Sequence, residues 1–77
     1  MVSAYVFIST NREPSLVAQE LTELDKIEST HLLYGEYDIV TKVKAKDMIR
    51  LRNFAIHELP KVQGIQKSTT LIVADEE

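Results

Sequence analysis

The chain of 77 residues contains no cysteine and only two glycines and two prolines. Without cysteine it cannot form the disulfides that stabilise small secreted scaffolds, so the fold must depend on packing. The scarcity of glycine and proline argues against a loop-rich structure. No apolar run approaches the ~20 residues that span a bilayer, and the apolar residues 4–8 lack the basic flank and the cleavage site of a signal peptide. We therefore expect a cytoplasmic protein with regular secondary structure and no membrane contact.

Charge is unevenly distributed along the chain. Acidic side chains outnumber basic ones by 12 to 9, which gives a net charge of −3 and no general attraction to nucleic acid. Residues 1–38 carry 2 basic and 7 acidic side chains, whereas residues 39–74 carry 7 and 2. Such a dipole can favour self-association, although charges of this kind more often mark solvated faces. We predict no direct contact with nucleic acid.

The first half of the chain is predicted to form a strand, a helix and a β-hairpin. Residues 1–10 are rich in β-branched and aromatic side chains, which indicates a strand. Pro14 suits the first turn of a helix. The apolar positions of this helix are Val17, Leu21 and Leu24. The period then changes to two, and residues 27–34 and 37–44 are expected as strands around a tight turn at Gly35-Glu36.

The second half is predicted to form a helix and a final strand. Asp47 is the expected N-cap of the helix, and Pro60 ends it after Leu59, because the residue before a proline disfavours the helical region. The apolar stripe of this helix is Met48, Leu51, Ala55 and Leu59. Residues 65–74 are expected as the last strand, and residues 75–77 as a tail.

This βαββαβ order predicts an α+β fold of the ferredoxin-like type in one domain over residues 1–77. Right-handed crossovers give a four-stranded antiparallel sheet with both helices on one face. The other face is also apolar in part, because the first strand has two apolar sides: Ala4, Val6 and Ile8 on one, Tyr5 and Phe7 on the other. The third strand alternates Tyr37, Ile39, Thr41 and Val43 against Asp38, Val40, Lys42 and Lys44. We expect a second copy to cover the outer face, as a homodimer of the dimeric α+β barrel type.

The sequence offers few groups for catalysis or metal binding. Its two histidines form no HxxxH or HExxH spacing, and there is no glycine-rich phosphate loop and no serine elbow. His31 is expected to be half-buried on a strand face shared with Ile27 and Leu33, and His57 is expected to face water. We therefore predict no catalytic residue, no metal site and no cofactor, in a protein that is not an enzyme.

Asp38 is the carboxylate least easily explained as a solvated residue. It follows the expected hairpin turn on the strand face opposite Tyr37, where a second subunit would partly desolvate it. A desolvated carboxylate needs a cationic partner, from the protein or from a ligand. Glu36 in the turn is more simply a solvated residue. The hydroxyls of Ser68–Thr70 lie in the last strand, where β-propensity alone can account for them.

The hairpin and the last strand also carry two motifs. Residues 35–40 read GEYDIV and are followed by KVKAKD at 42–47, and residues 64–73 read GIQKSTTLIV. Together they resemble the effector-binding domain of the Lrp/AsnC family of prokaryotic transcription regulators, the RAM (regulation of amino acid metabolism) module. The resemblance covers almost the whole chain. Full-length members begin with a helix-turn-helix, whereas Met1 leads directly into the first strand, so we expect a stand-alone RAM domain.

The resemblance implies a ferredoxin-like dimer whose copies join into octameric or decameric rings, with amino acid effectors bound between dimers. Matched residue by residue, it implies ligand binding by Gly35, Tyr37, Asp38, Ser68 and Thr70. Asp38 would pair with the ammonium of the ligand, while backbone N–H groups beside Gly35 and the two hydroxyls would serve its carboxylate. Residues 11–14 depart from the usual loop of the family.

The leading hypothesis is therefore a non-enzymatic amino acid sensor and oligomerisation module, linked to transcription regulation of amino acid metabolism. Full-length Lrp/AsnC regulators are its further expected partners. One alternative is a structural adaptor that joins such regulators without binding a ligand. Another is a small enzyme of the dimeric α+β barrel type, which would need a deep pocket lined by an acid or a histidine, for which His31 is the candidate.

Overall fold

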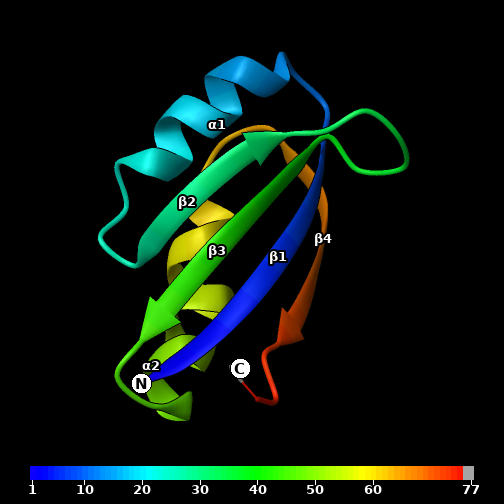
Figure 1. The fold of residues 1–77 in the computed structure, drawn as a ribbon. Coiled ribbons are helices and arrows are strands. Elements are labelled where there is room, and N and C mark those ends of the chain that lie inside the picture. Colours follow the sequence, from blue (N-terminus) through cyan, green and yellow to red (C-terminus); the bar gives the residue numbers. More distant parts are fainter. Residues whose placement is uncertain (76–77) are drawn as a thin grey trace.

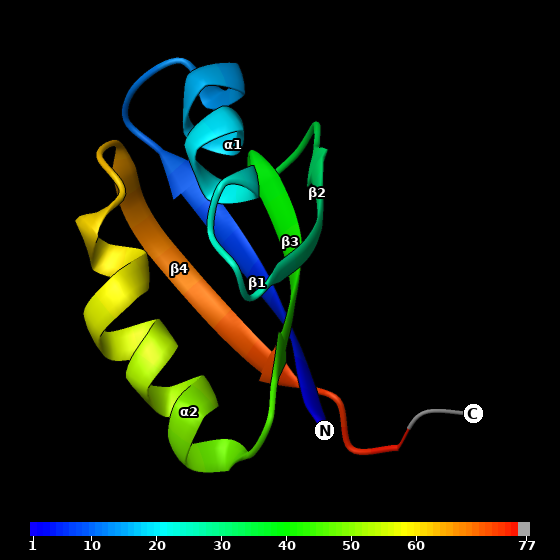
Figure 2. The ribbon, with the colours of Figure 1, turned by 90° about the vertical axis from the view of Figure 1, so that its left-hand side faces the viewer.

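The sheet and the helices form two layers. The computed structural model describes residues 1–75 and contains four antiparallel strands in the spatial order β2-β3-β1-β4. The strands are β1 (Val2–Thr10), β2 (Ile27–Leu32), β3 (Ile39–Ala45) and β4 (Ile65–Ile72). The helices are α1 (Pro14–Thr22) and α2 (Met48–Asn53), the latter continued by a π-helical segment η1 (Phe54–Glu58) and a 3-10 turn η2 (Leu59–Lys61). Both helices cover the same side of the sheet (Figure 1 and Figure 2). The order of elements confirms the predicted ferredoxin-like α+β fold.

The central strands β1 and β3 supply most of the sheet side of the core. Alternate residues on these strands are buried against the helices: Ala4, Val6, Ile8, Ile39, Val43 and Ala45. The register explains this pattern, because Val6 lies opposite Thr41 and Ile8 lies opposite Ile39, so that both buried sets share one face. The predicted grouping of Ala4, Val6 and Ile8 on one side of β1 is thus confirmed, and this is the side that faces the helices.

Helix α1 packs on this core through the predicted positions. It begins at Pro14, and both Val17 and Leu21 are completely buried. Helix α2 begins with the predicted cap, since the Arg50 N–H donates to Oδ1 of Asp47 at 2.9 Å. This backbone hydrogen bond favours the charged carboxylate and lowers the pKa of Asp47 below its ordinary value.

The second helical segment, which comprises α2, η1 and η2 over residues 48–61, departs from the regular α-helical spacing. The Leu59 N–H donates to the carbonyl of Phe54, five residues earlier, so one turn is wider than an α-helical turn. This wide turn directs both Phe54 and Leu59 into the core. The predicted stripe was correct at Leu51 and Leu59, but it missed Phe54 and included Met48, which is 42% exposed. The helical path also runs past the predicted end, because Pro60 lies in the first turn of η2, where no N–H is needed.

The connection between β2 and β3 is longer than the predicted tight turn. Residues 33–38 form a loop that is closed at its base by a hydrogen bond from the Leu33 N–H to the Asp38 carbonyl, at 2.8 Å. The two-residue turn at Gly35-Glu36 was therefore wrong. At the other end of the chain, β4 ends at Ile72 rather than at residue 74. The predicted tail comprised residues 75–77, of which 76 and 77 lie outside the described part of the chain.

A register irregularity in β2 changes the place of His31. Ile27 lies opposite Val43 on the core side, whereas His31 lies opposite Val40 on the outer side, and the register shifts between Ile27 and Ser29. The extra residue reverses the alternation of side chains along the strand. His31 is consequently exposed, and its predicted half-buried position beside Ile27 was wrong.

Candidate functional site

Loop 33–38 carries three of the five predicted ligand-binding residues: Gly35, Tyr37 and Asp38. Gly35 has a φ of 142°, a backbone conformation that favours glycine. A Cβ at this position would meet no atom within 4 Å, so the backbone and not the available space requires glycine. The N–H groups of residues 34–37 make no backbone hydrogen bond within residues 1–75. The loop therefore presents several N–H donors without internal partners.

Asp38 fastens this loop to the end of β1. Its Oδ2 accepts a hydrogen bond from the Thr10 N–H at 2.8 Å and another from the Thr10 hydroxyl at 3.2 Å. Its own N–H donates to the Ile8 carbonyl at 2.9 Å. No basic side chain in the described part of the chain forms an ion pair with Asp38, and its Oδ1 accepts no hydrogen bond there. One carboxylate oxygen is thus used by the fold, and the other has no hydrogen-bond partner within residues 1–75.

Tyr37, the neighbouring residue, lies on the outer face of the sheet. Its ring centroid is 5.7 Å from that of Phe7, and its hydroxyl lies 3.0 Å from Oγ1 of Thr69. Phe7 and Thr69 are opposite each other in the β1–β4 register, on the side away from the helices. The predicted place of Tyr37 on the same face as Ile39 was therefore wrong. The predicted place of Asp38 on the outer face was also wrong, since Asp38 lies in a groove beside the start of α1.

A groove of about 260 Å³ separates this loop from the start of α1. Its lining residues are Glu13, Pro14, Leu32, Leu33, Tyr34 and Asp38. The walls combine apolar side chains with two carboxylates, an arrangement that suits an occupant with a positive group and an apolar body. Sequence reasoning missed Glu13, Pro14 and Leu32, because nothing in a single sequence shows that the start of α1 meets the hairpin loop.

The two predicted hydroxyl positions lie on the other side of β1. Ser68 is opposite Ile8 and Thr70 is opposite Val6 in the β1–β4 register, and both are exposed. Ser68 lines a separate groove of about 190 Å³ between β4 and the end of the second helical segment. Within one chain, loop 33–38 reaches β4 only at Thr69, through the Tyr37 hydroxyl, and no hydrogen bond joins the loop to Ser68 or Thr70 among residues 1–75.

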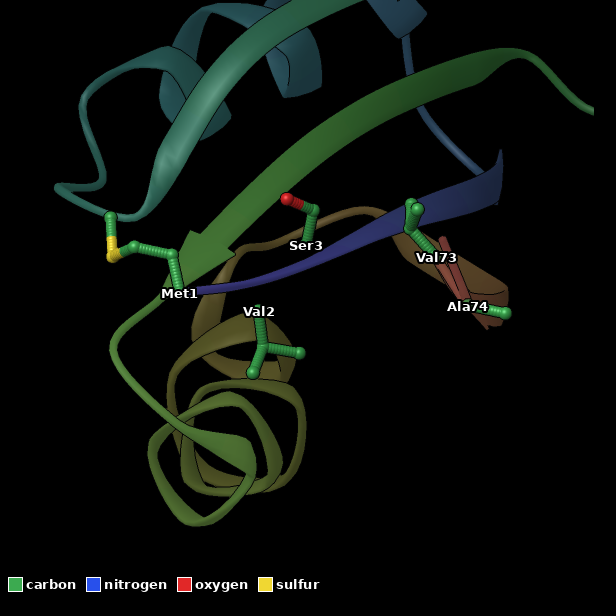
Figure 3. A pocket seen from close by; sticks show the side chains of 5 residues that line it. All are labelled: Met1, Val2, Ser3, Val73 and Ala74. Atoms are coloured by element: carbon green, nitrogen blue, oxygen red, sulfur yellow. The ribbon is translucent and has the colours of Figure 1, made fainter. Parts of the chain in front are cut away.

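Another hollow lies at the opposite end of the sheet, where the start of β1 meets the chain after β4. It has a volume of about 290 Å³ and is bordered by residues 1–3, 73 and 74, and the Val73 N–H donates to the Ser3 carbonyl at 2.9 Å there. Figure 3 shows Val2 and Ser3 pointing to opposite sides of β1. Among the described residues no charged side chain lines this hollow, whereas Glu13 and Asp38 line the groove beside loop 33–38.

The histidines lie apart from these grooves. His31 is on the outer face of the sheet, and His57 is exposed on η1, as predicted for His57. Residues 1–75 contain no group of three or more histidine, aspartate or glutamate side chains that could hold a metal ion. Over the same residues, no helix combines the length and the hydrophobicity needed to cross a bilayer.

The fold and the two motifs agree with a comparison against known families. The sequence model of the Lrp/AsnC ligand binding domain matches residues 3–77. The chain belongs to this family. A relative of this Lrp/AsnC domain, an uncharacterized helix-turn-helix-type transcriptional regulator of Pyrococcus horikoshii, is 33% identical over 70 residues, which cover 87% of this chain and 44% of the relative. The chain thus spans about half the length of the curated relatives it matches.

Solved structures show the same fold. A hypothetical protein from Pyrococcus horikoshii superposes with a TM-score of 0.89 at 27% identity, over 100% of this Lrp/AsnC domain and 94% of that chain. A transcriptional regulator from Neisseria meningitidis, in complex with L-Met, superposes with a TM-score of 0.82 at 19% identity, over 97% of this chain and 51% of that chain. The second likeness concerns the fold alone.

Proposed function

We propose that this Lrp/AsnC domain binds a free amino acid in the groove between loop 33–38 and α1, and that it acts in the cytoplasm as a sensor and assembly module rather than as an enzyme. The observation that carries the proposal is the state of Asp38. One oxygen of this half-buried carboxylate is bonded to Thr10, and the other has no hydrogen-bond partner in the described chain, at the edge of an apolar groove. A half-buried carboxylate is stabilised by a cationic ligand.

Each part of an amino acid has a matching group in this groove. The ammonium can pair with Asp38, and the carboxylate of Glu13 adds a second negative charge beside it. The ligand carboxylate can accept hydrogen bonds from the N–H groups of residues 34–37. An aliphatic side chain would pack on Pro14 and Leu32. The Neisseria regulator supports this class of ligand, because a chain of the same fold holds L-Met.

Ser68 and Thr70 would enter this site from a second copy. An assembly that places β4 of one copy beside loop 33–38 of another would add hydroxyl donors near the ligand carboxylate. A site shared by two copies is consistent with the family resemblance, which implies that effectors bind between dimers. In such an assembly the occupied groove would also hold two copies together.

We infer further that the outer face of the sheet packs against a second copy. Tyr5 and Leu71 are opposite each other in the β1–β4 register, and they are 41% and 56% exposed there. Phe7 and Val40 lie on the same face, and both are only half-buried. Covering this apolar surface would stabilise so small a chain. The proposed partners are thus a second copy, further dimers in an octameric or decameric ring, and full-length Lrp/AsnC regulators.

Calorimetric titration with each of the twenty amino acids tests the binding proposal. We expect at least one to bind, and we expect Asp38→Asn to weaken its affinity by roughly 10- to 100-fold, since a charge-assisted hydrogen bond is lost. Glu13→Gln should weaken it less. Thr10→Val is the matched control, because it removes a hydrogen bond from Asp38 without changing the groove. Unaltered affinity in Asp38→Asn, or no binding by any amino acid, would contradict the proposal.

The same titration separates the alternatives. A chain that assembles with itself or with full-length regulators, but binds none of the twenty amino acids, would be the structural adaptor. The enzyme alternative depended on a histidine in a deep pocket, and His31 is exposed on the outer face. Sedimentation of a Leu71→Glu variant tests the sheet-face dimer, since a buried carboxylate there should disrupt this contact and weaken the self-association of the chain relative to the natural sequence.

A further inference from the structure

The outward side of the second helical segment carries apolar side chains that the core does not use. Ile49 and Ile56 are 71% and 55% exposed, and they line the same groove. Together with Arg52, Asn53 and His57 they line a groove of about 270 Å³, which we name the α2 groove. Covering these two isoleucines with an apolar group of a partner would remove exposed apolar surface from water.

The α2 groove is basic as well as apolar. Arg52 forms no ion pair within residues 1–75, and no carboxylate lines the groove. The neighbouring acidic residues are already used, since Asp47 pairs with Arg50 and Glu58 pairs with Lys26. An occupant must therefore bring both an apolar side chain and a negative charge.

The exposed side of α1 has this composition. Leu16 is 47% exposed, and Gln19 and Glu23 follow it at helical spacing on the solvent side. We name these three residues the α1 face. Glu23 has no ion-pair partner in the described chain, whereas Glu20 beside it pairs with Arg12 at 3.3 Å. The α1 face thus offers one apolar side chain and one unpaired carboxylate.

We propose that the α2 groove binds the α1 face of a second copy of this chain, with Leu16 packed between Ile49 and Ile56 and Glu23 beside Arg52. Charge favours this pairing over contact between two α2 grooves, because the latter would bring the Arg52 side chains of both copies together and they would repel each other. The contact goes beyond the proposed sensor function and does not depend on a bound ligand.

The arrangement of the helices allows this contact to be symmetric. Both helices lie on the same side of the sheet (Figure 2). A twofold axis that brings the helix layers of two copies together can place α1 of each copy over α2 of the other, which gives two equivalent contacts and a closed interface. This helix-layer contact uses the side of the molecule opposite to the outer sheet face. The two kinds of contact can therefore coexist in one assembly.

A charge-swap series tests the proposal by sedimentation equilibrium at low salt. The parent is the Leu71→Glu chain, in which the sheet-face contact is disrupted and helix-layer association remains to be measured. We expect Arg52→Glu or Glu23→Arg alone to weaken this association about tenfold, and the double variant Arg52→Glu/Glu23→Arg to restore it. Lys67→Glu is the matched control, since it makes the same charge change on an exposed residue of β4 and should have no effect.

Three results would overturn the proposal. The first is a Leu71→Glu chain that is monomeric at every concentration. The second is association that Arg52→Glu and Lys67→Glu weaken equally, which would indicate a general charge effect. The third is a double variant no better than the single ones. The amino acid titration on the unaltered chain is independent of all three, so failure of this contact is distinguishable from failure of the sensor proposal.

Discussion

A single oxygen of Asp38, Oδ2, accepts hydrogen bonds from both the main-chain N–H and the hydroxyl of Thr10, 28 residues earlier in the sequence. These bonds join the end of β1 to the last residue of the hairpin loop. The residue proposed to bind the ligand ammonium therefore also holds the loop in place. Substitutions of Asp38 will change both properties, and variants of Thr10 separate them.

Thr10→Val should lower the free energy of unfolding without changing the groove. The variant loses the hydroxyl hydrogen bond to Asp38 but keeps the one from its N–H, so we expect a loss of about 1 kcal/mol. Urea denaturation followed by circular dichroism measures it. Thr10→Ser keeps the hydroxyl and should lose less. A Thr10→Val variant as stable as the natural chain would show that the 3.2 Å contact contributes little.

Thr41→Val should have the opposite effect. Thr41 is fully buried, and its hydroxyl has no hydrogen-bond partner among the described residues; the same holds for the hydroxyl of Thr30, which lies opposite it in β2. Valine has the same shape and no polar group to desolvate, so we expect a gain of about 1 kcal/mol in unfolding free energy. The same denaturation experiment applies. A loss of stability would show that the Thr41 hydroxyl is hydrogen-bonded in solution.

Gly64→Ala should destabilise the fold more than Gly35→Ala. Both glycines have positive φ, 97° at Gly64 and 142° at Gly35, so alanine costs about 1 kcal/mol of backbone strain at either position. At Gly64 an added Cβ would also lie 2.3 Å from Cγ of Arg12 and 2.9 Å from Cγ2 of Val17, whereas at Gly35 it meets nothing. Thermal denaturation of the two variants gives the comparison. Equal losses would mean that Arg12 moves aside freely.

The lowered pKa of Asp47 predicts that the start of α2 contributes to the free energy of unfolding in a pH-dependent way. The backbone hydrogen bond from Arg50 makes this pKa lower in the folded chain than in the unfolded chain. The carboxylate therefore stabilises the fold above its unfolded pKa, and this contribution is lost as the pH falls through the folded pKa.

Asp47→Asn isolates that contribution, because asparagine keeps the cap acceptor but does not titrate. Chemical denaturation between neutral pH and about pH 2 should show the natural chain more stable than the variant at neutral pH, with the difference shrinking in acid. A difference that stays constant over this range would assign it to packing or cap geometry rather than to charge.

The order of elements could be predicted from the sequence because buried apolar residues recur with the period of a strand or a helix. In β1 and α1 the residues that face the core keep this period. Val17 and Leu21 are buried at the expected spacing, and Asp47 caps α2 as its residue type predicts. The errors fall where the backbone leaves the regular period. The extra residue before Ser29 moved His31 to the outer face, and the wide turn at η1 brought Phe54 into the core.

The candidate site was predicted only in part, for a different reason. The hairpin motif led to Asp38, but its fastening to Thr10 and the groove walls at Glu13 and Leu32 depend on contacts between distant segments. A single sequence records no such contacts. Ser68 has a recognisable residue type, yet in one chain it lines a different groove from Asp38, so its part in the proposed site rests on the proposed assembly.

Tyr37 and Asp38 are adjacent in the chain, yet they are held on opposite sides of the sheet, one by Thr69 and the other by Thr10. A single peptide unit therefore connects the groove proposed to bind an amino acid with the surface proposed to meet a second copy. If ligand binding moves Asp38, the Tyr37 ring, which packs 5.7 Å from that of Phe7, would move with it. Thermodynamic linkage would make this coupling reciprocal. If a ligand in the groove stabilised the contact between two copies, that contact would raise the affinity for the ligand by the same free energy.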